Sequence, residues 1–410
     1  MDRSALSIAT PEIRRDFGLS LAGMGVLLSV FPWAYGISQL VAGPVVDRIG
    51  PRLLVGLGLA VWSGVQAAAG LVNGVTQLFL ARMGLGMAES PLSPGTIRVL
   101  RSWIRSEDRG LAISICFSGA ALGPAVAPPV LTWLMLRWGW RAMFVAVGFV
   151  GLLLALIWWN VYHDTSHYSF SAAEHAELPT EETPLTARFS FARWFWLFRF
   201  PAFWGMVLGN FGLVYLAWLY ITWLPGYLEI ERHMSVLRTG IYSGIPQLAG
   251  LFGFWSAGWV GDRLLLAGFS SMNSRKIPII VGLVGMAVAT VPAALVHDNN
   301  LAIIFITIAV FLGSASQPAQ WALVTVVAPP EQVSTFGGLT NFGGAMGGAA
   351  SAVVTGYIAQ ATGSFVSALI LGGVLAVIAA LLYGLAVRRP ITSGVLEQAP
   401  RAQVTAPDAR

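Results

Sequence analysis

Residues 43–48 read GPVVDR and residues 258–263 read GWVGDR, so the pattern G-x-x-x-D-R occurs twice, 215 residues apart. Each copy closes a long apolar stretch, and a polar, Glu-rich segment over 162–200 lies between the two. Either copy alone would carry little weight, because glycine and aspartate are common near helix ends. Two copies at matching positions predict a chain built from two tandem halves of the same topology.

The composition is that of a membrane protein. Of the 410 residues, 56% are hydrophobic and only 10% are charged, whereas soluble proteins carry about 25% charged residues. This balance excludes soluble domains, disorder and nucleic-acid binding, and it predicts an all-α protein whose partner is the lipid bilayer, because a spanning helix needs about 20 apolar residues. Apolar windows occupy residues 21–46, 52–72, 75–99, 110–136, 139–161, 201–228, 236–260, 277–297, 300–328, 333–360 and 363–387.

Residues 1–13 precede these eleven windows and have a helical apolar pattern that stops near Pro11. The segment is too short to cross a bilayer and lacks the features of a signal peptide, so we interpret it as half of a first span whose other half is missing. We therefore expect twelve spans with the first one truncated. A start codon further upstream would account for the missing half.

The distribution of basic residues predicts the orientation. Sixteen lysines and arginines lie in loops on one side of the predicted spans, and six lie on the other. Positive residues favour the cytoplasmic side, so both termini and the 162–200 segment are expected in the cytoplasm, which requires an even number of spans. The predicted organisation is a six-helix half over 1–161, a cytoplasmic linker over 162–200, a second six-helix half over 201–389 and a disordered cytoplasmic tail over 390–410.

Four ionisable residues fall inside predicted spans: Asp2, Arg3, Arg82 and Glu89. Each costs about 2.5–3.5 kcal/mol at the centre of a span, which makes all four candidates for function. Arg82 and Glu89 are seven residues apart and share a helix face, separated by about 10 Å of rise, too far for direct contact. Two carboxylates and two guanidiniums are formally neutral, so protonation of one carboxylate would release an arginine. Salt bridges that merely lock helices together are the alternative.

Polar groups that could hold a substrate accompany this set. The planar guanidinium of Arg3 can bind a carboxylate through two hydrogen bonds and keeps its charge. Ser90-Pro91 interrupts the helix directly after Glu89, either to line a cavity or simply as a kink. Tyr35 and Gln39 share a helix face. Further candidates are Gln317, Gln320, Trp321 and Asn341, and Trp321 could instead be an interfacial anchor or plain packing.

Longer stretches resemble a known family. GPVVDRIGPR at 43–52 resembles the loop motif of the major facilitator superfamily, and the resemblance covers nearly the whole chain. DRSALSIATPEI at 2–13, FPWAYG at 31–36 and ARMGLGMAESPLSPGTIRVLRSWIRSEDRGLA at 81–112 resemble its anion:cation symporter family, which includes proton-coupled carriers of sugar acids and of some aromatic acids. GLTNFGG at 338–344 and TGYIAQATGSF at 355–365 resemble it too, although Ala352 stands where a helix-bending proline is expected.

The resemblance implies roles for single residues. It implies that Glu89 and Asp2 bind protons, that Arg82 links these carboxylates, and that Arg3 holds the carboxylate of the substrate. It also implies substrate contacts for Tyr35, Trp321 and Asn341. The loop-motif residues would gate the carrier from the cytoplasmic side rather than bind substrate; they are Asp47, Arg48, Arg52, Asp262 and Arg263.

The sequence thus predicts a secondary active transporter, monomeric and multi-pass in a bacterial inner membrane, that takes up an organic anion with protons by alternating access. A hexonate, hexarate or hexuronate sugar acid is the expected substrate. An aromatic-acid symporter is an alternative, since tryptophans crowd the second half, and an anion exchanger or a non-transporting sensor are others. No enzyme, cofactor or metal site is expected, because the five histidines are irregularly spaced and no P-loop is present.

Overall fold

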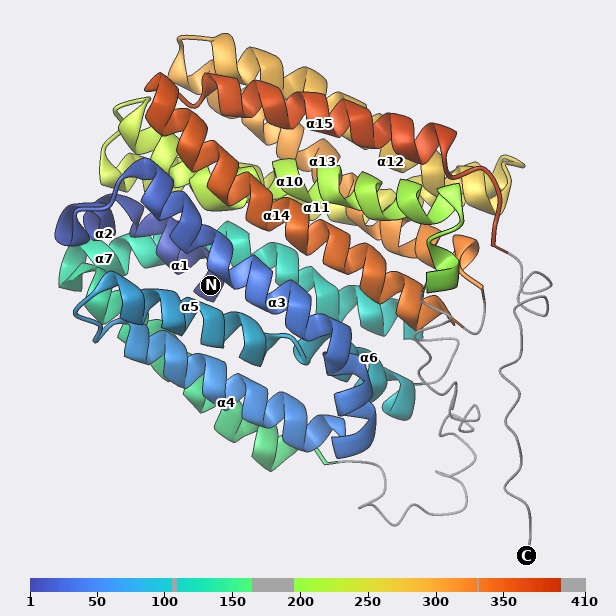
Figure 1. The fold of residues 1–410 in the computed structure, drawn as a ribbon, viewed down its shortest axis with the longest axis horizontal. Helices are drawn as coiled ribbons and strands as arrows, with labels where there is room; N and C mark the ends of the chain where they lie inside the picture. The colour runs from blue at the N-terminus through green and yellow to red at the C-terminus, as the bar shows by residue number, and fades with distance from the viewer. Residues whose placement is uncertain (105–108, 164–194, 330–331, 392–410) are drawn as a thin grey trace, which may run out of the picture.

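The computed structural model describes residues 1–104, 109–163, 195–329 and 332–391, and the elements within these ranges are helices that run roughly side by side (Figure 1). The first part of the chain forms α1 (Asp2–Ile8), α2 (Thr10–Phe17), α3 (Leu21–Ile49), α4 (Pro51–Ala69), α5 (Val75–Glu89), α6 (Leu92–Trp103) and α7 (Arg109–Val161). The second part forms α10 (Pro201–Ile230), α11 (Val236–Leu266), α12 (Ser271–Leu295), α13 (Asn299–Val327), α14 (Val333–Thr362) and α15 (Val366–Leu385).

Several helix ends follow from local sequence signals. The Ser20 hydroxyl accepts the Gly23 backbone N–H at the start of α3, and the Asp298 carboxylate accepts the Leu301 N–H at the start of α13. The predicted window 75–99 is divided into α5 and α6, because Pro91 follows Ser90 there. The windows 110–136 and 139–161 lie in α7, which consists of two helices that meet at a kink at Gly139, where the backbone is not helical and φ is 78°.

The helices pack into two bundles. In the first, α3 and α4 pack on α5, and α4 also packs on α7; in the second, α12 packs on α13 and α15, and α10 on α14 and α15. The bundles meet chiefly where α3 packs on α14, α7 on α11 and α1 on α10, and the first of these pairs lies across the middle of Figure 1. The predicted division at 162–200 falls mainly outside the described residues and stays a prediction.

The contact between α3 and α14 is unusually close. A Cβ atom on Gly25 would lie 2.6 Å from the Ala352 backbone oxygen and 3.2 Å from the Cα of Gly356. Reciprocally, a Cβ on Gly356 would lie 2.6 Å from the Leu21 oxygen. Glycine is therefore required on both sides of this seam, as at other close helix contacts in membranes.

Eight helical stretches in the described residues are long and apolar enough to cross a membrane, in α3, α4, α7, α10, α12, α13, α14 and α15. The all-helical, multi-pass character predicted from composition is confirmed. The count of twelve spans and the truncated first span stay predictions.

Candidate functional site

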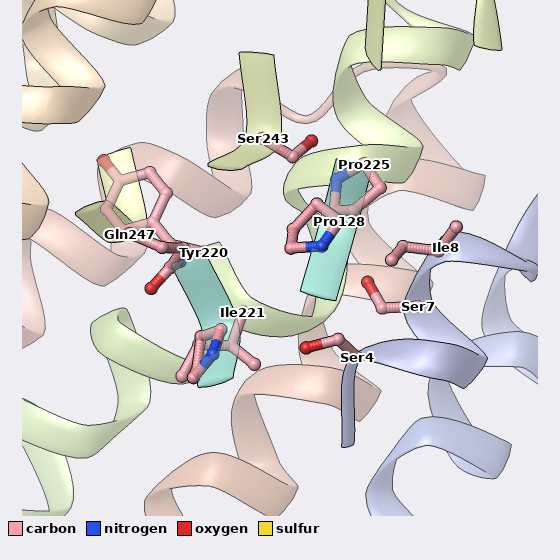
Figure 2. Close-up of a pocket in the computed structure, with 10 residues that line it drawn as sticks. Ser4, Ser7, Ile8, Pro128, Tyr220, Ile221, Pro225, Ser243 and Gln247 are labelled. Atoms are coloured by element: carbon pink, nitrogen blue, oxygen red, sulfur yellow. The ribbon is translucent and has the colours of Figure 1, made fainter. Parts of the chain in front are cut away.

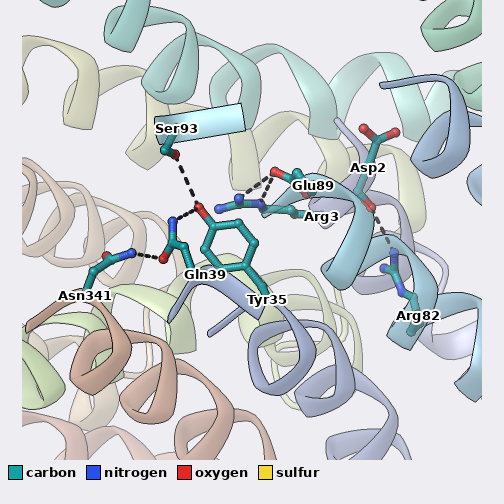
Figure 3. Close-up of polar contacts among 8 residues, drawn as sticks. All are labelled: Asp2, Arg3, Tyr35, Gln39, Arg82, Glu89, Ser93 and Asn341. Carbon is teal, nitrogen blue, oxygen red and sulfur yellow. Dashed lines mark hydrogen bonds and ion pairs between the residues drawn. The ribbon is translucent and has the colours of Figure 1, made fainter. Parts of the chain in front are cut away.

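The centre of the site is an ion pair between α1 and α5. Arg3 Nη2 lies 2.5 Å from Glu89 Oε1, and Arg3 Nε lies 3.1 Å from the same oxygen, so two N–H donors meet one carboxylate oxygen (Figure 3). The Glu89 side chain is 13% exposed and that of Arg3 is 38% exposed. Because Pro91 ends the helix, Glu89 is the last residue of α5, where the unpaired carbonyls of a helix end disfavour a negative charge. A cationic partner offsets that effect.

Three aromatic rings surround the Arg3 guanidinium. Its central carbon lies 5.0 Å from the ring centroids of Phe31 and Tyr35, and 5.8 Å from that of Trp218. Such distances allow cation–π attraction. Phe31 also stacks on Tyr35, with centroids 5.7 Å apart, and on Trp218, with centroids 6.1 Å apart. Two of the rings come from α3, and the third comes from α10 in the other bundle.

Asp2 and Arg82 meet through the main chain. Arg82 is 3% exposed, and its Nη1 donates to the backbone oxygen of Asp2 over 3.3 Å (Figure 3). Its Nε has no hydrogen-bond partner in the described structure. A link from Arg82 to a carboxylate, as the resemblance implied, is not among the described contacts and stays a prediction. Arg82 and Glu89 lie on one helix without direct contact, as their spacing predicts.

A chain of polar side chains joins the two bundles beside the ion pair. The Asn341 amide on α14 donates to Gln39 Oε1 on α3, and Gln39 Nε2 donates to Tyr35 Oη over 2.8 Å. The Tyr35 hydroxyl in turn lies 3.4 Å from Ser93 Oγ on α6. Figure 3 shows this chain leading toward the Arg3–Glu89 pair. Three of the predicted substrate contacts, Tyr35, Gln39 and Asn341, are therefore close together.

Other predicted contacts lie on α13. Trp321 is 47% exposed and lies beside Gly337 of α14, whereas Gln320 is buried and Gln317 is half-buried. No contact in the described structure joins these three side chains to Arg3 or Glu89. Their roles stay predictions.

The residues predicted to gate the carrier contact their own bundles. Asp262 Oδ1 pairs with Arg275 Nη2 at 3.2 Å, and Arg263 lies over the ring of Trp259. In the first bundle, Arg52 Nη2 donates to the Trp159 backbone oxygen over 3.2 Å. Arg48 is exposed, and the Asp47 side chain lies outside the described residues. The gating role stays a prediction.

A small pocket lies between α1, α7, α10 and α11 (Figure 2). Its lining includes Ser4 and Ser7 of α1, Pro225 of α10 and Ser243 of α11. Ser7 Oγ donates to the Thr222 backbone oxygen over 2.5 Å, which ties α1 to α10. The Ser243 hydroxyl is buried without a partner in the described structure. The pocket thus lies between the bundles, with a few serine hydroxyls in a mostly apolar lining.

Sequence reasoning missed Phe31, Ser93 and Trp218 as neighbours of the site. Phe31 lies four residues before Tyr35 and therefore shares its helix face, a signal that could have found it. No sequence signal places Trp218 near Arg3, because the two are far apart in the chain and on different bundles. Across the described ranges, no cluster of three His, Cys, Asp or Glu side chains could hold a metal ion.

Two helical membrane bundles with a charged pair and polar groups at their junction are typical of membrane transporters. The model of the Major Facilitator Superfamily matches residues 1–351, and the chain belongs to that family. The family and the relatives of this chain are transporters, not enzymes, in agreement with the prediction.

Two relatives and one solved structure illustrate the similarity. The chain is 38% identical over 394 residues to the probable L-galactonate transporter of Escherichia coli (strain K12), covering 95% of this chain and 86% of that protein. It is 32% identical over 398 residues to the D-galactonate transporter of Escherichia coli O6:H1, and the match covers 93% of this chain and 91% of that protein. The inward-facing, occupied structure of a bacterial homolog of the human lysosomal transporter Spinster shares the fold, with a TM-score of 0.76 and 20% sequence identity. The match covers 94% of this chain and 93% of that one. The predicted resemblance to sugar-acid carriers is confirmed.

Proposed function

We propose that this protein takes up a sugar acid, most specifically a hexonate, together with protons by alternating access. The names of the two galactonate-transporting relatives support the substrate class. The observation that carries the proposal is the Arg3–Glu89 contact, in which both facing N–H donors of the guanidinium are bonded to one carboxylate oxygen.

The Glu89 carboxylate and the substrate carboxylate would compete for the Arg3 guanidinium. A guanidinium keeps its charge at all working pH values, so a change at this pair must come from the carboxylate. Protonation of Glu89 removes its negative charge and weakens its hold on Arg3. A substrate carboxylate can then take the place of Glu89 and restore the charge balance. Loss of the Glu89 charge would leave the Arg3 cation without an anionic partner in a half-buried site, which favours loading of proton and substrate together.

The polar chain beside Arg3 would select the hydroxylated part of the substrate. Gln39, Tyr35 and Asn341 now satisfy one another, so hydroxyl groups that replace these internal bonds bind without leaving amides unpaired. A substrate that displaced these internal bonds without hydroxyl groups to replace them would leave buried polar groups unpaired, which disfavours it. We propose contacts further along the substrate for Gln317, Gln320 and Trp321, and proton binding or relay for Asp2 and Arg82.

The same proposal includes the membrane frame. Two bundles that meet along a few helix pairs can rock about a site at their junction. We propose a monomer with twelve spans in the bacterial inner membrane, with both termini on the cytoplasmic side. Its cytoplasmic gate would include Asp47, Arg48, Arg52, Asp262 and Arg263.

The second candidate is an aromatic-acid symporter, which the three rings around Arg3 favour. A panel in proteoliposomes separates the two: L-galactonate, D-galactonate, galactarate, phthalate and 4-hydroxyphenylacetate, each added while external pH is recorded. Sugar acids are expected to cause external alkalinisation and the aromatic acids are not. Alkalinisation by the aromatic acids alone would favour the second candidate, and exchange without a pH change would favour an anion exchanger. Binding with neither exchange nor proton movement would indicate a sensor.

Glu89→Gln tests the coupling residue. The variant is expected to keep exchange of labelled galactonate across the membrane and to lose accumulation driven by a pH gradient, because glutamine cannot exchange a proton. Glu12→Gln on α2, away from the pair, is the matched control and is expected to accumulate substrate normally. Gradient-driven accumulation by Glu89→Gln would show that the proton is carried elsewhere.

A further inference from the structure

The Arg3 guanidinium has partners that do not titrate. Phe31 and Trp218 face it at 5.0 and 5.8 Å and stack on each other with an interplanar angle of 23°. Phe31 is buried, and Trp218 is half-buried. The indole is fixed from behind, because a Cβ on Gly348 of α14 would lie 2.9 Å from Trp218 Cγ, so only glycine leaves the ring its place.

The ion pair alone cannot hold Arg3 through a transport cycle. Once Glu89 is neutral, the guanidinium loses its only carboxylate partner in the described structure, and its long side chain can take many rotamers. Arg82, the other arginine near α1, contacts the Asp2 backbone and repels a second cation. The aromatic faces attract the guanidinium in either protonation state of Glu89.

We infer that Phe31 and Trp218 are positioning residues for Arg3: they keep the guanidinium in place while Glu89 is neutral, so that it can receive the substrate carboxylate. The inference rests on the proposed function, because it assumes that Arg3 binds an anionic substrate. Trp218 belongs to α10 and Phe31 to α3, so the two bundles share the enclosure. Arg3 therefore contacts both rings only while α10 stays against α1 and α3.

The test is substrate counterflow in proteoliposomes with L-galactonate and D-galactonate, comparing Trp218→Leu, Trp218→Phe and the wild type. Counterflow needs no proton gradient, so it reports the binding of substrate separately from coupling. Loss of one cation–π face is expected to raise the KM of Trp218→Leu by about 5- to 30-fold, with Vmax within about twofold. Phenylalanine keeps a ring and is expected to recover most of the affinity.

Controls separate positioning from folding. Trp204→Leu removes an exposed tryptophan at the start of the same helix, α10, and is expected to leave KM unchanged. If Trp218→Leu does not reach the membrane, Phe31→Leu removes a face at 5.0 Å and carries the same expected rise in KM.

Two results would overturn the inference. One is a wild-type KM in both Trp218→Leu and Phe31→Leu. The other is an equal fall of Vmax in Trp218→Leu and Trp218→Phe at constant KM, which would indicate that the tryptophan acts through packing alone. A wild type that binds and exchanges no galactonate would refute the proposed function as well. If the wild type transports galactonate and the variants have the wild-type KM, only the positioning role of Phe31 and Trp218 is refuted.

Discussion

Arg3→Lys is the sharpest single test of the ion pair, because it keeps the positive charge and removes the pair of N–H donors that the guanidinium directs at Glu89. Arginine places Nε and Nη2 on the same Glu89 oxygen at 3.1 and 2.5 Å, whereas lysine is a point charge that can direct one N–H along that line. A hydrogen bond to a charged group contributes about 1.5–3 kcal/mol. Since the Arg3 side chain is 38% exposed, the lower end applies, about 1.5 kcal/mol, or roughly a tenfold loss of affinity.

Counterflow of L-galactonate measures that loss directly. We expect the KM of Arg3→Lys to rise about tenfold, because in the proposed mechanism the substrate carboxylate would take the position that Glu89 now holds and would meet the same donors. Arg389→Lys, an exposed exchange of the same kind beyond α15, should leave KM at the wild-type value. A KM for Arg3→Lys within about twofold of wild type would refute the argument that the two-donor geometry binds the substrate.

Two further predictions concern the scaffold. Gly25→Ala places a methyl group against the backbone of α14, so we expect the free energy of unfolding to fall by about 1–3 kcal/mol and uptake to be reduced. The control Gly64→Ala, where the space is open, should be neutral or slightly stabilising in thermal unfolding. Asp16 accepts hydrogen bonds from Trp140 and Arg141, which hold its pKa below the usual range. This stabilisation is present at neutral pH and lost as pH falls through the lowered pKa, so Asp16→Asn should reduce the thermal midpoint by about 1–2 °C at pH 7 and by less near pH 3.

The fold was largely predictable because the bilayer restricts the chain to helices of a given length. The window 201–228 became α10, Pro201–Ile230, and the window 333–360 became α14, Val333–Thr362. The division at Ser90-Pro91 was visible in the sequence as well. Spacing along the chain cannot say which helices touch, so the close approach of α3 and α14 required the structure.

The candidate site was predicted as a set of residues but not as a set of contacts. Asp2, Arg3, Arg82 and Glu89 were found because charge inside a span is costly. Spacing excluded a direct contact between Arg82 and Glu89, but it could not show that Arg3 contacts Glu89, since 86 residues separate these two partners. The contact of Trp218 with Arg3 could not be predicted either, because local periodicity carries no information on how the two bundles face each other.

The glycine seam between α3 and α14 has a consequence for the permeability of the membrane. Where Gly25 and Gly356 meet, backbone touches backbone, and few side-chain rotamers exist there to reorganise when one bundle rolls on the other. If the two bundles rock against each other as proposed, such a contact would turn at low entropic cost and would stay closed to water. Small ions and protons outside the substrate route would then be kept from passing between the bundles, and the gradient that drives the proposed uptake would not be dissipated by the motion it powers.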